Sequence, residues 1–420
     1  MDVDLMQAET TPCGRALPRA QHYLSLWICG LLFGYIALLP FTPLLNLERN
    51  GFLILLGSLA AWCLVNRKLF YVQTPYDPML LAFLMWVALT LPFAVSPLYS
   101  MQEYGKLLQQ VLIFYAVVYF LNGHQSRRTL FYLIAGLAIV VAGYGLTQFN
   151  LTNAQDVKSF FSSEVWLTTF LIMVFPFSLA LAFGNGPSRV KILAIVASVL
   201  FFTCLWGTQS RAGLISFLTV LWVMAWLFRS RRSWIVAAAV TILLVLAVLV
   251  ASRIDVSKAT DPMRGTNLSS ATHRFNIWTF ALPEILKHGI VGIGYGNHSY
   301  PLTYGDQMEV VEPGHSPVRR VGTHNIFLYM ALHIGLPGLA LFGWLYYTFV
   351  VTTIQEYRNA TDWLQQGILA GSVGSLLGLL CRVQFDQMLV GSLAVFFWVL
   401  MAMAVLQYPS LKTSLKSSLA

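Results

Sequence analysis

The sequence predicts an all-α polytopic membrane protein with about twelve transmembrane helices and one long loop outside the membrane. Of its 420 residues, 57% are hydrophobic and 10% are charged, whereas soluble domains carry about 25% charged residues. The apolar residues fall in solid runs of roughly the length that a helix needs to span a bilayer. They do not alternate with polar residues, as the strands of an outer-membrane barrel would.

Twelve apolar runs are candidate transmembrane helices. They lie at residues 24–45, 49–65, 78–95, 105–121, 128–149, 165–184, 189–206, 212–228, 233–251, 324–350, 364–381 and 387–406. We therefore expect spans within 24–251 and 324–406, a long loop at 252–323, and polar tails at 1–23 and 407–420. Prolines beside the outer ends of the first and third runs fit kinks or helix ends.

The distribution of basic residues predicts the orientation. Of the 26 Lys and Arg residues, fourteen lie in the tails and short loops on one side, and five lie at the opposite helix ends. Basic loops stay in the cytoplasm, and loops longer than about 60 residues hardly affect orientation. Both tails are therefore expected inside and the long loop outside. Nucleic-acid binding is excluded because the basic residues lie in short loops between apolar runs.

Polar side chains near the start of the fourth run share one helix face. Glu103, Lys106 and Gln110 are separated by three and four residues, which places them on the same side of a helix. Two interpretations stay open. Glu103 and Lys106 form an ion pair at the outer end, or Lys106 belongs to the polar lining of an outer cavity.

An arginine stands at the expected outer end of the eighth run, in Ser210-Arg211-Ala212-Gly213. A helix-end arginine often only extends its charge to the membrane surface. Arg211, however, lies on the side where basic charge is scarce. It also starts a helix, where the dipole disfavours a cation but attracts a bound anion.

The long loop contains an amphipathic segment followed by a glycine-rich turn. Residues 272–289 predict an interfacial helix with Thr272 as its N-cap, Arg274 near its start, and Pro283 as a break or kink. Gly292-Ile293-Gly294-Tyr295-Gly296-Asn297 follows. It lacks the strand–helix–strand context of a dinucleotide site, so we interpret it as a tight turn approached closely by a ligand or another segment. Residues 301–322 are expected to be irregular.

Polar residues flank the last three runs. His324 opens the tenth run, which contains Gly335-Leu336-Pro337-Gly338, a predicted break or close-packing site. Arg382 and Asp386 lie four residues apart between the last two runs. They are interpreted equally well as a mutually neutralising pair or as functional residues lining a cavity, since ionisable groups at membrane depth are commonly functional.

Arg211, Arg274 and His324 are all expected on the outer side. Two guanidinium groups can bind phosphate oxygens through paired hydrogen bonds, and a histidine can accept a proton near neutral pH. Together they are a minimal set for glycosyl transfer from a polyprenyl-diphosphate sugar. The long loop offers no carboxylate pair for a divalent cation, so no metal and no cofactor are expected.

Three motifs resemble those of the O-antigen ligase superfamily, in order and on the same side of the membrane. They are Ser210-Arg211-Ala212-Gly213, Arg274 with Trp278 and the 292–297 glycine turn, and His324-Asn325 with Phe327-Leu328. The superfamily also includes O-antigen polymerases and protein O-oligosaccharyltransferases. The resemblance implies a GT-C-like fold and a metal-independent, inverting glycosyltransferase. His324 matches the proposed base, and Arg211 and Arg274 match the arginines that contact the donor diphosphate.

The resemblance also implies the substrates and the location. The donor is a polysaccharide on undecaprenyl diphosphate, and the acceptor is the lipid A-core oligosaccharide at the periplasmic face of the bacterial inner membrane. Membrane lipids are the other expected partners, nucleic acid is not expected, and the oligomeric state stays open. Asn297, His315, Arg319 and Arg320 are candidate loop or acceptor contacts. A ligase is the leading hypothesis, a polymerase of the same superfamily is the nearest alternative, and a lipid-linked glycan flippase is a second.

Overall fold

The computed structural model describes residues 19–149, 157–255, 267–306, 322–386 and 390–408, and all their regular elements are helical. The first nine α-helices are α1 (Arg19–Leu38), α2 (Leu45–Asn66), α3 (Asp77–Thr90), α4 (Pro97–Phe120), α5 (His124–Thr147), α6 (Glu164–Phe183), α7 (Ser188–Gly207), α8 (Arg211–Phe228) and α9 (Arg231–Asp255). The others are α10 (Asn267–Lys287), α11 (Ser299–Tyr304), α12 (Ile326–Asn359), α13 (Trp363–Arg382) and α14 (Gly391–Val405). Short 3-10 turns, η1 (Thr42–Leu44) and η2 (Leu91–Phe93), follow α1 and α3.

Every predicted apolar run overlaps one main helix, α1–α9 or α12–α14, although the first and third runs continue past α1 and α3 through η1 and η2. Within the described residues, eight helices are long and apolar enough to cross a membrane, namely those ending at Leu38, Asn66, Thr147, Phe183, Gly207, Phe228, Asn359 and Arg382. Two more, Asp77–Phe93 and Gly391–Val405, are apolar but shorter. The chain is therefore a multi-pass helical membrane protein, and the count of twelve spans stays a prediction.

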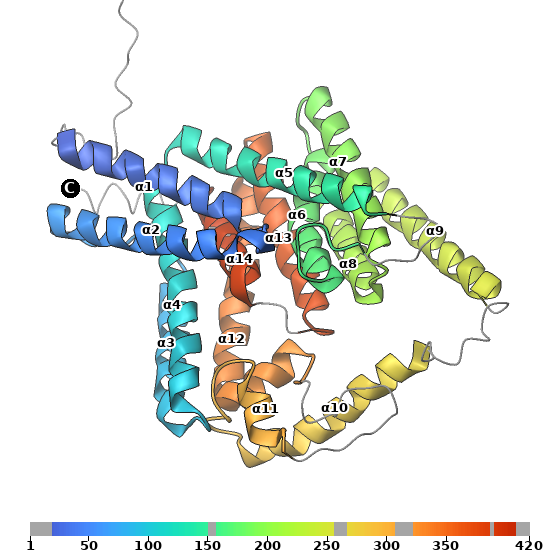
Figure 1. Ribbon diagram of the computed structural model, residues 1–420. Helices are drawn as coiled ribbons and strands as arrows, with labels where there is room; N and C mark the ends of the chain where they lie inside the picture. Colours follow the sequence, from blue (N-terminus) through green and yellow to red (C-terminus); the bar gives the residue numbers. More distant parts are fainter. Residues whose placement is uncertain (1–18, 150–156, 256–266, 307–321, 387–389, 409–420) are drawn as a thin grey trace, which may run out of the picture.

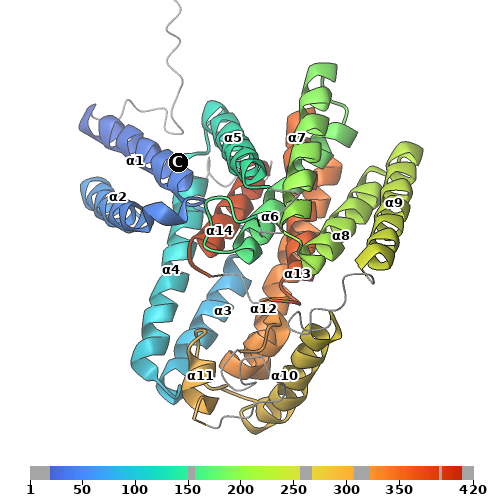
Figure 2. The same cartoon turned by 45° about the vertical axis from the view of Figure 1, so that its right-hand side comes forward.

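The most buried helices, α6, α13 and α14, occupy the centre of the bundle (Figures 1 and 2). Glycines allow α13 to pack closely on its neighbours. A Cβ on Gly371 would meet the Phe177 ring of α6 at 2.4 Å, and one on Gly378 would meet Val220 of α8 at 2.3 Å. Small residues at such contacts are a common way for membrane helices to pack.

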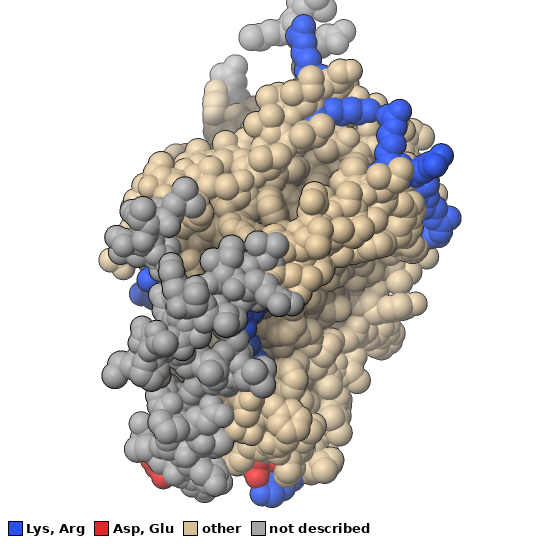
Figure 3. Space-filling model, turned by 90° about the vertical axis from the view of Figure 1, so that its right-hand side faces the viewer, with Lys and Arg blue, Asp and Glu red and all other residues tan. Residues whose placement is uncertain are grey.

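The surface between the ends of the bundle carries few charges. On the face drawn in Figure 3, Lys and Arg side chains gather toward one end, and a broad band of other residues extends away from it. Helix α9 also exposes large apolar side chains, including Ile235, Leu243 and Leu246. Such a surface suits a hydrocarbon environment.

The opposite end of the molecule carries α10 and α11, which lie beside the turn between α3 and α4 and beneath α12 (Figure 1). We call this the outer end. The glycine turn before α11 is fastened there, because Val95 N donates to Ile293 O at 3.0 Å and Gly294 N donates to His333 O at 3.0 Å.

The glycine turn has the close approach that the sequence predicts. Gly292, Gly294 and Gly296 have φ values of 72°, 118° and 119°. A Cβ on Gly296 would lie 2.5 Å from Glu103 of α4, and one on Gly292 would lie 2.4 Å from the His333 backbone of α12. Close packing of the turn against α4 and α12 therefore explains why these positions are glycine.

Helix α12 is broken at Gly335, which has a φ of 75° and a ψ of 172°. The predicted break is confirmed. The first segment, residues 326–334, is short and largely buried, and the second runs on to Asn359. A Cβ at Gly335 would lie 1.8 Å from the carbonyl oxygen of Ile290, so glycine permits both the break and the packing of the loop against it.

Several predicted local boundaries are wrong. Helix α10 starts at Asn267, so Thr272 lies inside the helix and is not its N-cap. The helix also continues through Pro283 to Lys287, because proline removes one backbone donor and a surface helix can leave the freed carbonyl to water. Helix α4 starts eight residues earlier than predicted, and α11 occupies part of the stretch predicted to be irregular.

Candidate functional site

A histidine, a carboxylate and an arginine form a connected group at the outer end. His324 Nδ1 lies 2.9 Å from Asp386 Oδ1, and Arg382 Nη1 donates to Asp386 Oδ2 at 3.1 Å. The side chains differ in exposure, at 32% for His324, 13% for Asp386 and 1% for Arg382. The buried arginine therefore holds the carboxylate in place, and His324 is the residue of the three that a substrate can reach.

The carboxylate of Asp386 is held in its ionised form. Burial by itself raises its pKa, but the hydrogen bond with His324 and the charge of Arg382 outweigh that effect and keep the pKa below its ordinary value. An ionised carboxylate only accepts hydrogen bonds. A neutral His324 that donates to this carboxylate carries its proton on Nδ1 and has its Nε2 lone pair available to accept a proton from a substrate.

The backbone around His324 is shaped by local hydrogen bonds. His324 has a φ of 47°, and the next residue, Asn325, is the N-cap of α12, accepting from Phe327 N at 2.9 Å and Leu328 N at 3.1 Å. Its amide nitrogen donates to Gln384 Oε1 at 3.0 Å. These bonds tie the start of α12 to the turn that carries Asp386.

Arg274 approaches the same group from α10. It is within electrostatic range of Arg382 and lines a hollow of about 440 Å³ with Thr272, Phe275, Trp278 and Phe385. Trp278 Nε1 donates to Thr323 O at 3.1 Å, which fastens α10 to the residue before His324. The structure therefore brings Arg274, His324, Arg382 and Asp386 together.

Arg211 is the first residue of α8. The preceding Ser210 caps the helix, and its Oγ accepts from Gly213 N at 3.1 Å. Helices α8 and α13 are antiparallel, because Met224 contacts Gly374 whereas Val220 contacts Gly378. The N-terminus of α8 thus lies at the same end of the bundle as Arg382.

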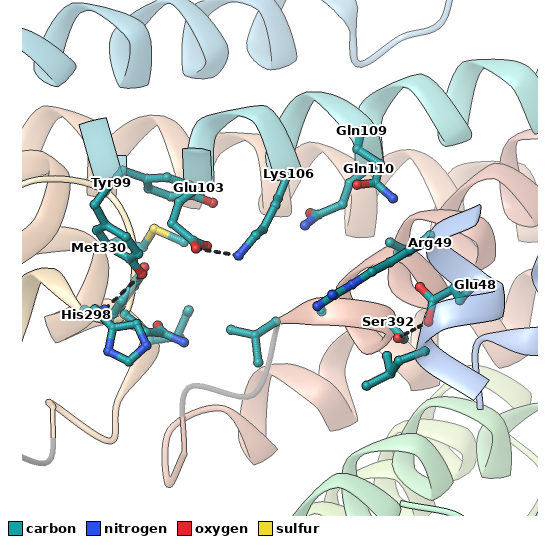
Figure 4. A pocket seen from close by; sticks show the side chains of 18 residues that line it. Glu48, Arg49, Tyr99, Glu103, Lys106, Gln109, Gln110, His298, Met330 and Ser392 are labelled. Carbon is teal, nitrogen blue, oxygen red and sulfur yellow. Dashed lines mark hydrogen bonds and ion pairs between the residues drawn. The ribbon is translucent and has the colours of Figure 1, made fainter. Parts of the chain in front are cut away.

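A polar cavity of about 360 Å³ lies beside the first segment of α12, which supplies Ile326, Tyr329 and Met330 to its lining. Its walls come from α2, α4, the glycine turn, α12 and α14 (Figure 4). The charged and polar lining residues are Glu48, Arg49, Tyr99, Glu103, Lys106, Gln109, Gln110, Tyr295, Asn297, His298, Tyr329 and Ser392. The cavity lies close to the histidine group, because Ile326 lines it and follows His324 by two residues.

Both interpretations of the polar face of α4 hold. Lys106 Nζ lies 2.6 Å from Glu103 Oε1, so the two residues form an ion pair, and both line the cavity. Asn297 lines it as well. Arg382 and Asp386 are not among its lining residues, since they belong to the group around His324. His315, Arg319 and Arg320 lie outside the described residues.

Sequence analysis did not single out Glu48, Arg49, His298 and Ser392, which all line the cavity. Glu48 accepts a hydrogen bond from Ser392 Oγ at 2.6 Å, a contact between residues 344 positions apart in the chain. The charged pair Glu48-Arg49 beside an apolar run was a usable signal, because charges there are scarce. The sequence pattern alone does not show that α14 completes the same cavity.

These features define a polytopic membrane protein with a polar site at one end of its helical bundle. Residues 196–343 match the family model described as O-antigen ligase, and this segment contains Arg211, Arg274, the glycine turn and His324. A Rickettsia typhi protein with the provisional name of polysaccharide ligase is 22% identical over 284 residues, covering 64% of this chain and 67% of the relative. The comparisons confirm the resemblance to the O-antigen ligase superfamily.

Proposed function

We propose that the protein is a ligase that transfers a polysaccharide from undecaprenyl diphosphate to the lipid A-core oligosaccharide, at the periplasmic face of the bacterial inner membrane. The observation that carries this proposal is the His324–Asp386 pair with Arg382 and Arg274 beside it. It combines a histidine that can accept a proton with a further cation, Arg274, for an anionic leaving group.

In the proposed reaction, His324 Nε2 takes the proton of an acceptor hydroxyl as its oxygen attacks the anomeric carbon of the donor. A new C–O bond forms, the bond to the diphosphate breaks, and its electron pair leaves with the diphosphate. Attack opposite the leaving group inverts the configuration. Arg211 and Arg274 are the proposed diphosphate contacts, because arginine forks match pairs of phosphate oxygens.

Asp386 and Arg382 take supporting roles in this proposal. Asp386 fixes the histidine tautomer and stabilises the imidazolium that forms, and Arg382 holds Asp386 in place. The group as described needs no metal to activate the hydroxyl, because the histidine supplies the base.

The apolar face of α8 suits the lipid part of the donor. A shallow hollow of about 620 Å³ is lined along α8 by Ile215, Leu218, Thr219, Trp222, Val223 and Trp226, with Leu377 of α13. It begins one helical turn beyond Arg211 and continues along the helix. A polyprenyl chain could lie in it while its diphosphate stays near the N-terminus of α8.

Transfer by purified protein tests the proposal. In lipid nanodiscs that contain the donor, we expect the polymer to move onto lipid A-core. In the same sample without acceptor, the lipid-linked chains should not increase in length. Extension of the lipid-linked polymer, with none on lipid A-core, would identify a polymerase instead. Movement of intact donor across a liposome membrane without transfer would identify a flippase.

A further inference from the structure

One cation of the polar cavity, Arg49, lies within range of the charge of Glu48 but forms no ion pair with it. Arg49 extends from α2 into the cavity, opposite Lys106 of α4 (Figure 4). Lys106 is paired with Glu103, and Glu48 accepts from Ser392. No hydrogen bond or ion pair of Arg49 occurs among the described residues. Its guanidinium group can therefore bind an external anion.

The neighbouring uncharged groups are fixed in orientation. Gln110 Oε1 accepts from Trp398 Nε1 at 3.1 Å, and Gln109 Nε2 donates to Tyr35 Oη at 3.1 Å. Within the described residues, the amide nitrogen of Gln110 and the amide oxygen of Gln109 have no protein partner. The cavity thus presents one directed donor and one directed acceptor, and sugar hydroxyls both donate and accept hydrogen bonds.

Aromatic side chains complete the lining. Tyr99 and Tyr295 both line the cavity, and Tyr99 accepts a hydrogen bond from His298 N at 3.1 Å. Tyrosine offers an apolar ring face together with a polar hydroxyl, which suits the two kinds of surface on a sugar ring. The volume of about 360 Å³ falls in the range of roughly 300–1,000 Å³ found for small-molecule sites.

The charge balance limits the anion that the cavity can bind. A diphosphate would need two or more cations, but Lys106 is already 2.6 Å from Glu103. Arg49 has no ion-pair partner among the described residues, although Glu48 lies within range of its charge. It therefore matches at most a single acidic substituent, either a phosphate monoester or a carboxylate. The fixed amides match the hydroxyl groups around it. A lipid diphosphate is therefore a poorer fit to this cavity than an acidic sugar.

We infer that this cavity is a saccharide subsite that binds an acidic sugar of the acceptor, with Arg49 recognising its phosphate or carboxylate group. The role as acceptor subsite rests on the proposed function. Its location supports that role, because Ile326, Tyr329 and Met330 form one wall of the cavity and belong to the helix that starts just after His324. An acidic sugar in the cavity leaves a neighbouring sugar of the same chain to reach the histidine.

Direct binding tests the ligand class without requiring transfer. Full-length protein in nanodiscs is titrated with mannose, mannose 6-phosphate, glucuronic acid and inorganic phosphate, and binding is followed by saturation-transfer NMR. We expect both acidic sugars to bind better than mannose, and Arg49→Gln to weaken them about tenfold while mannose binding is unchanged. Lys287→Gln is the matched control, since Lys287 is an exposed outer cation paired with Glu284.

Each result bears on the inference. A preference for acidic sugars that survives Arg49→Gln would overturn it. Inorganic phosphate that binds as well as mannose 6-phosphate would also overturn it, because the site would then recognise a free anion. Comparison of mannose 6-phosphate with glucuronic acid identifies which acidic group the cavity prefers.

Transfer kinetics separate this inference from the proposed function. With lipid A-core as acceptor, Arg49→Gln should raise the acceptor KM about tenfold and leave the donor KM unchanged. Where the direct titration shows a preference for mannose 6-phosphate, enzymatic removal of phosphate from the acceptor should have the same effect on the wild type and none on the variant. An unaltered acceptor KM would reject the subsite and keep the ligase. Arg49-dependent sugar binding without any transfer would reject the ligase and the acceptor role, but keep the acidic-sugar site.

Discussion

His324 has a backbone φ of 47°, a conformation that costs a non-glycine residue about 1–2 kcal/mol. The neighbouring contacts hold it there: the Asn325 cap on one side, the Trp278–Thr323 bond on the other, and the Asp386 carboxylate on its ring. Strain retained at a residue with a free ring nitrogen is typical of functional sites.

Replacement of His324 tests its role as the base. We expect His324→Ala and His324→Gln to fold normally and to lose transfer by 100-fold or more, in line with the roughly 10²–10⁴-fold contribution of a general base. Glutamine can still donate to Asp386 but cannot take a proton. Purified variants are compared by initial rates at saturating donor and acceptor, with melting temperatures as the folding control. Wild-type turnover in either variant would show that His324 is not the base.

Replacement of the arginines by lysine tests the phosphate contacts. Arg211→Lys and Arg274→Lys keep the charge but lose the paired hydrogen bonds. At about 1.5–3 kcal/mol for hydrogen bonds to charged groups, each change should lower kcat/KM by about 10–100-fold. The same change at Arg67, an exposed residue at the opposite end of the bundle, should have no effect. Full activity in either variant would indicate a structural arginine.

The lowered pKa of Asp386 gives a pH dependence of stability with a definite sign. A carboxylate whose folded pKa lies below its ordinary value of 3.8 stabilises the fold above that value, and the contribution is lost as pH falls through the lowered pKa. The melting-temperature difference between wild type and Asp386→Asn should therefore be full above about pH 5 and shrink below pH 4. A difference that stayed constant from pH 7 to pH 3 would contradict this.

At the scale of helices, the break in α12 arranges the site. Its first segment forms one wall of the cavity and starts two residues after His324, and its second segment runs on through the bundle. The sequence predicts the break because Gly335 and Pro337 interrupt an apolar run. It does not predict where the first segment packs, since that depends on the contact of Gly335 with Ile290, 45 residues earlier in the chain.

Two glycines of α12 give a matched test of this arrangement. Gly335→Ala puts a Cβ 1.8 Å from Ile290 O at a φ of 75°, so we expect it to lower stability by about 2 kcal/mol or more. Gly343→Ala meets nothing within 4 Å and should be neutral or stabilise by up to about 1 kcal/mol. Thermal unfolding in detergent measures both. Equal melting temperatures would show that the break is not set by Gly335.

The helices themselves were largely predictable, because apolar runs of about 20 residues have few structures open to them in a bilayer. The ends of the helices were less predictable. At Thr272 and Pro283, the preference of one residue for a helix end is outweighed by packing. At the site, the residues near sequence motifs were found. Arg49 and Ser392 were missed because their function depends on contacts between distant helices.

For the molecule as a whole, the distribution of basic residues predicts which end faces the cytoplasm. Arg67, Arg128 and Arg232 lie at the loop ends expected inside, and α10 lies at the outer end. In a cysteine-free background, Lys287→Cys should react with a membrane-impermeant maleimide in intact spheroplasts, and Lys191→Cys should react only after lysis. Labelling in the reverse order would invert the topology and place the site in the cytoplasm.

The first segment of α12 has a cavity on one face and the His324 group at its start, and it is joined to the rest of its helix through a single glycine. A molecule that pushes this segment from the cavity side must alter the spacing on the other side. The two substrates should therefore not bind independently: saturation with one is expected to change the dissociation constant of the other, and the enzyme acquires a preferred order of loading.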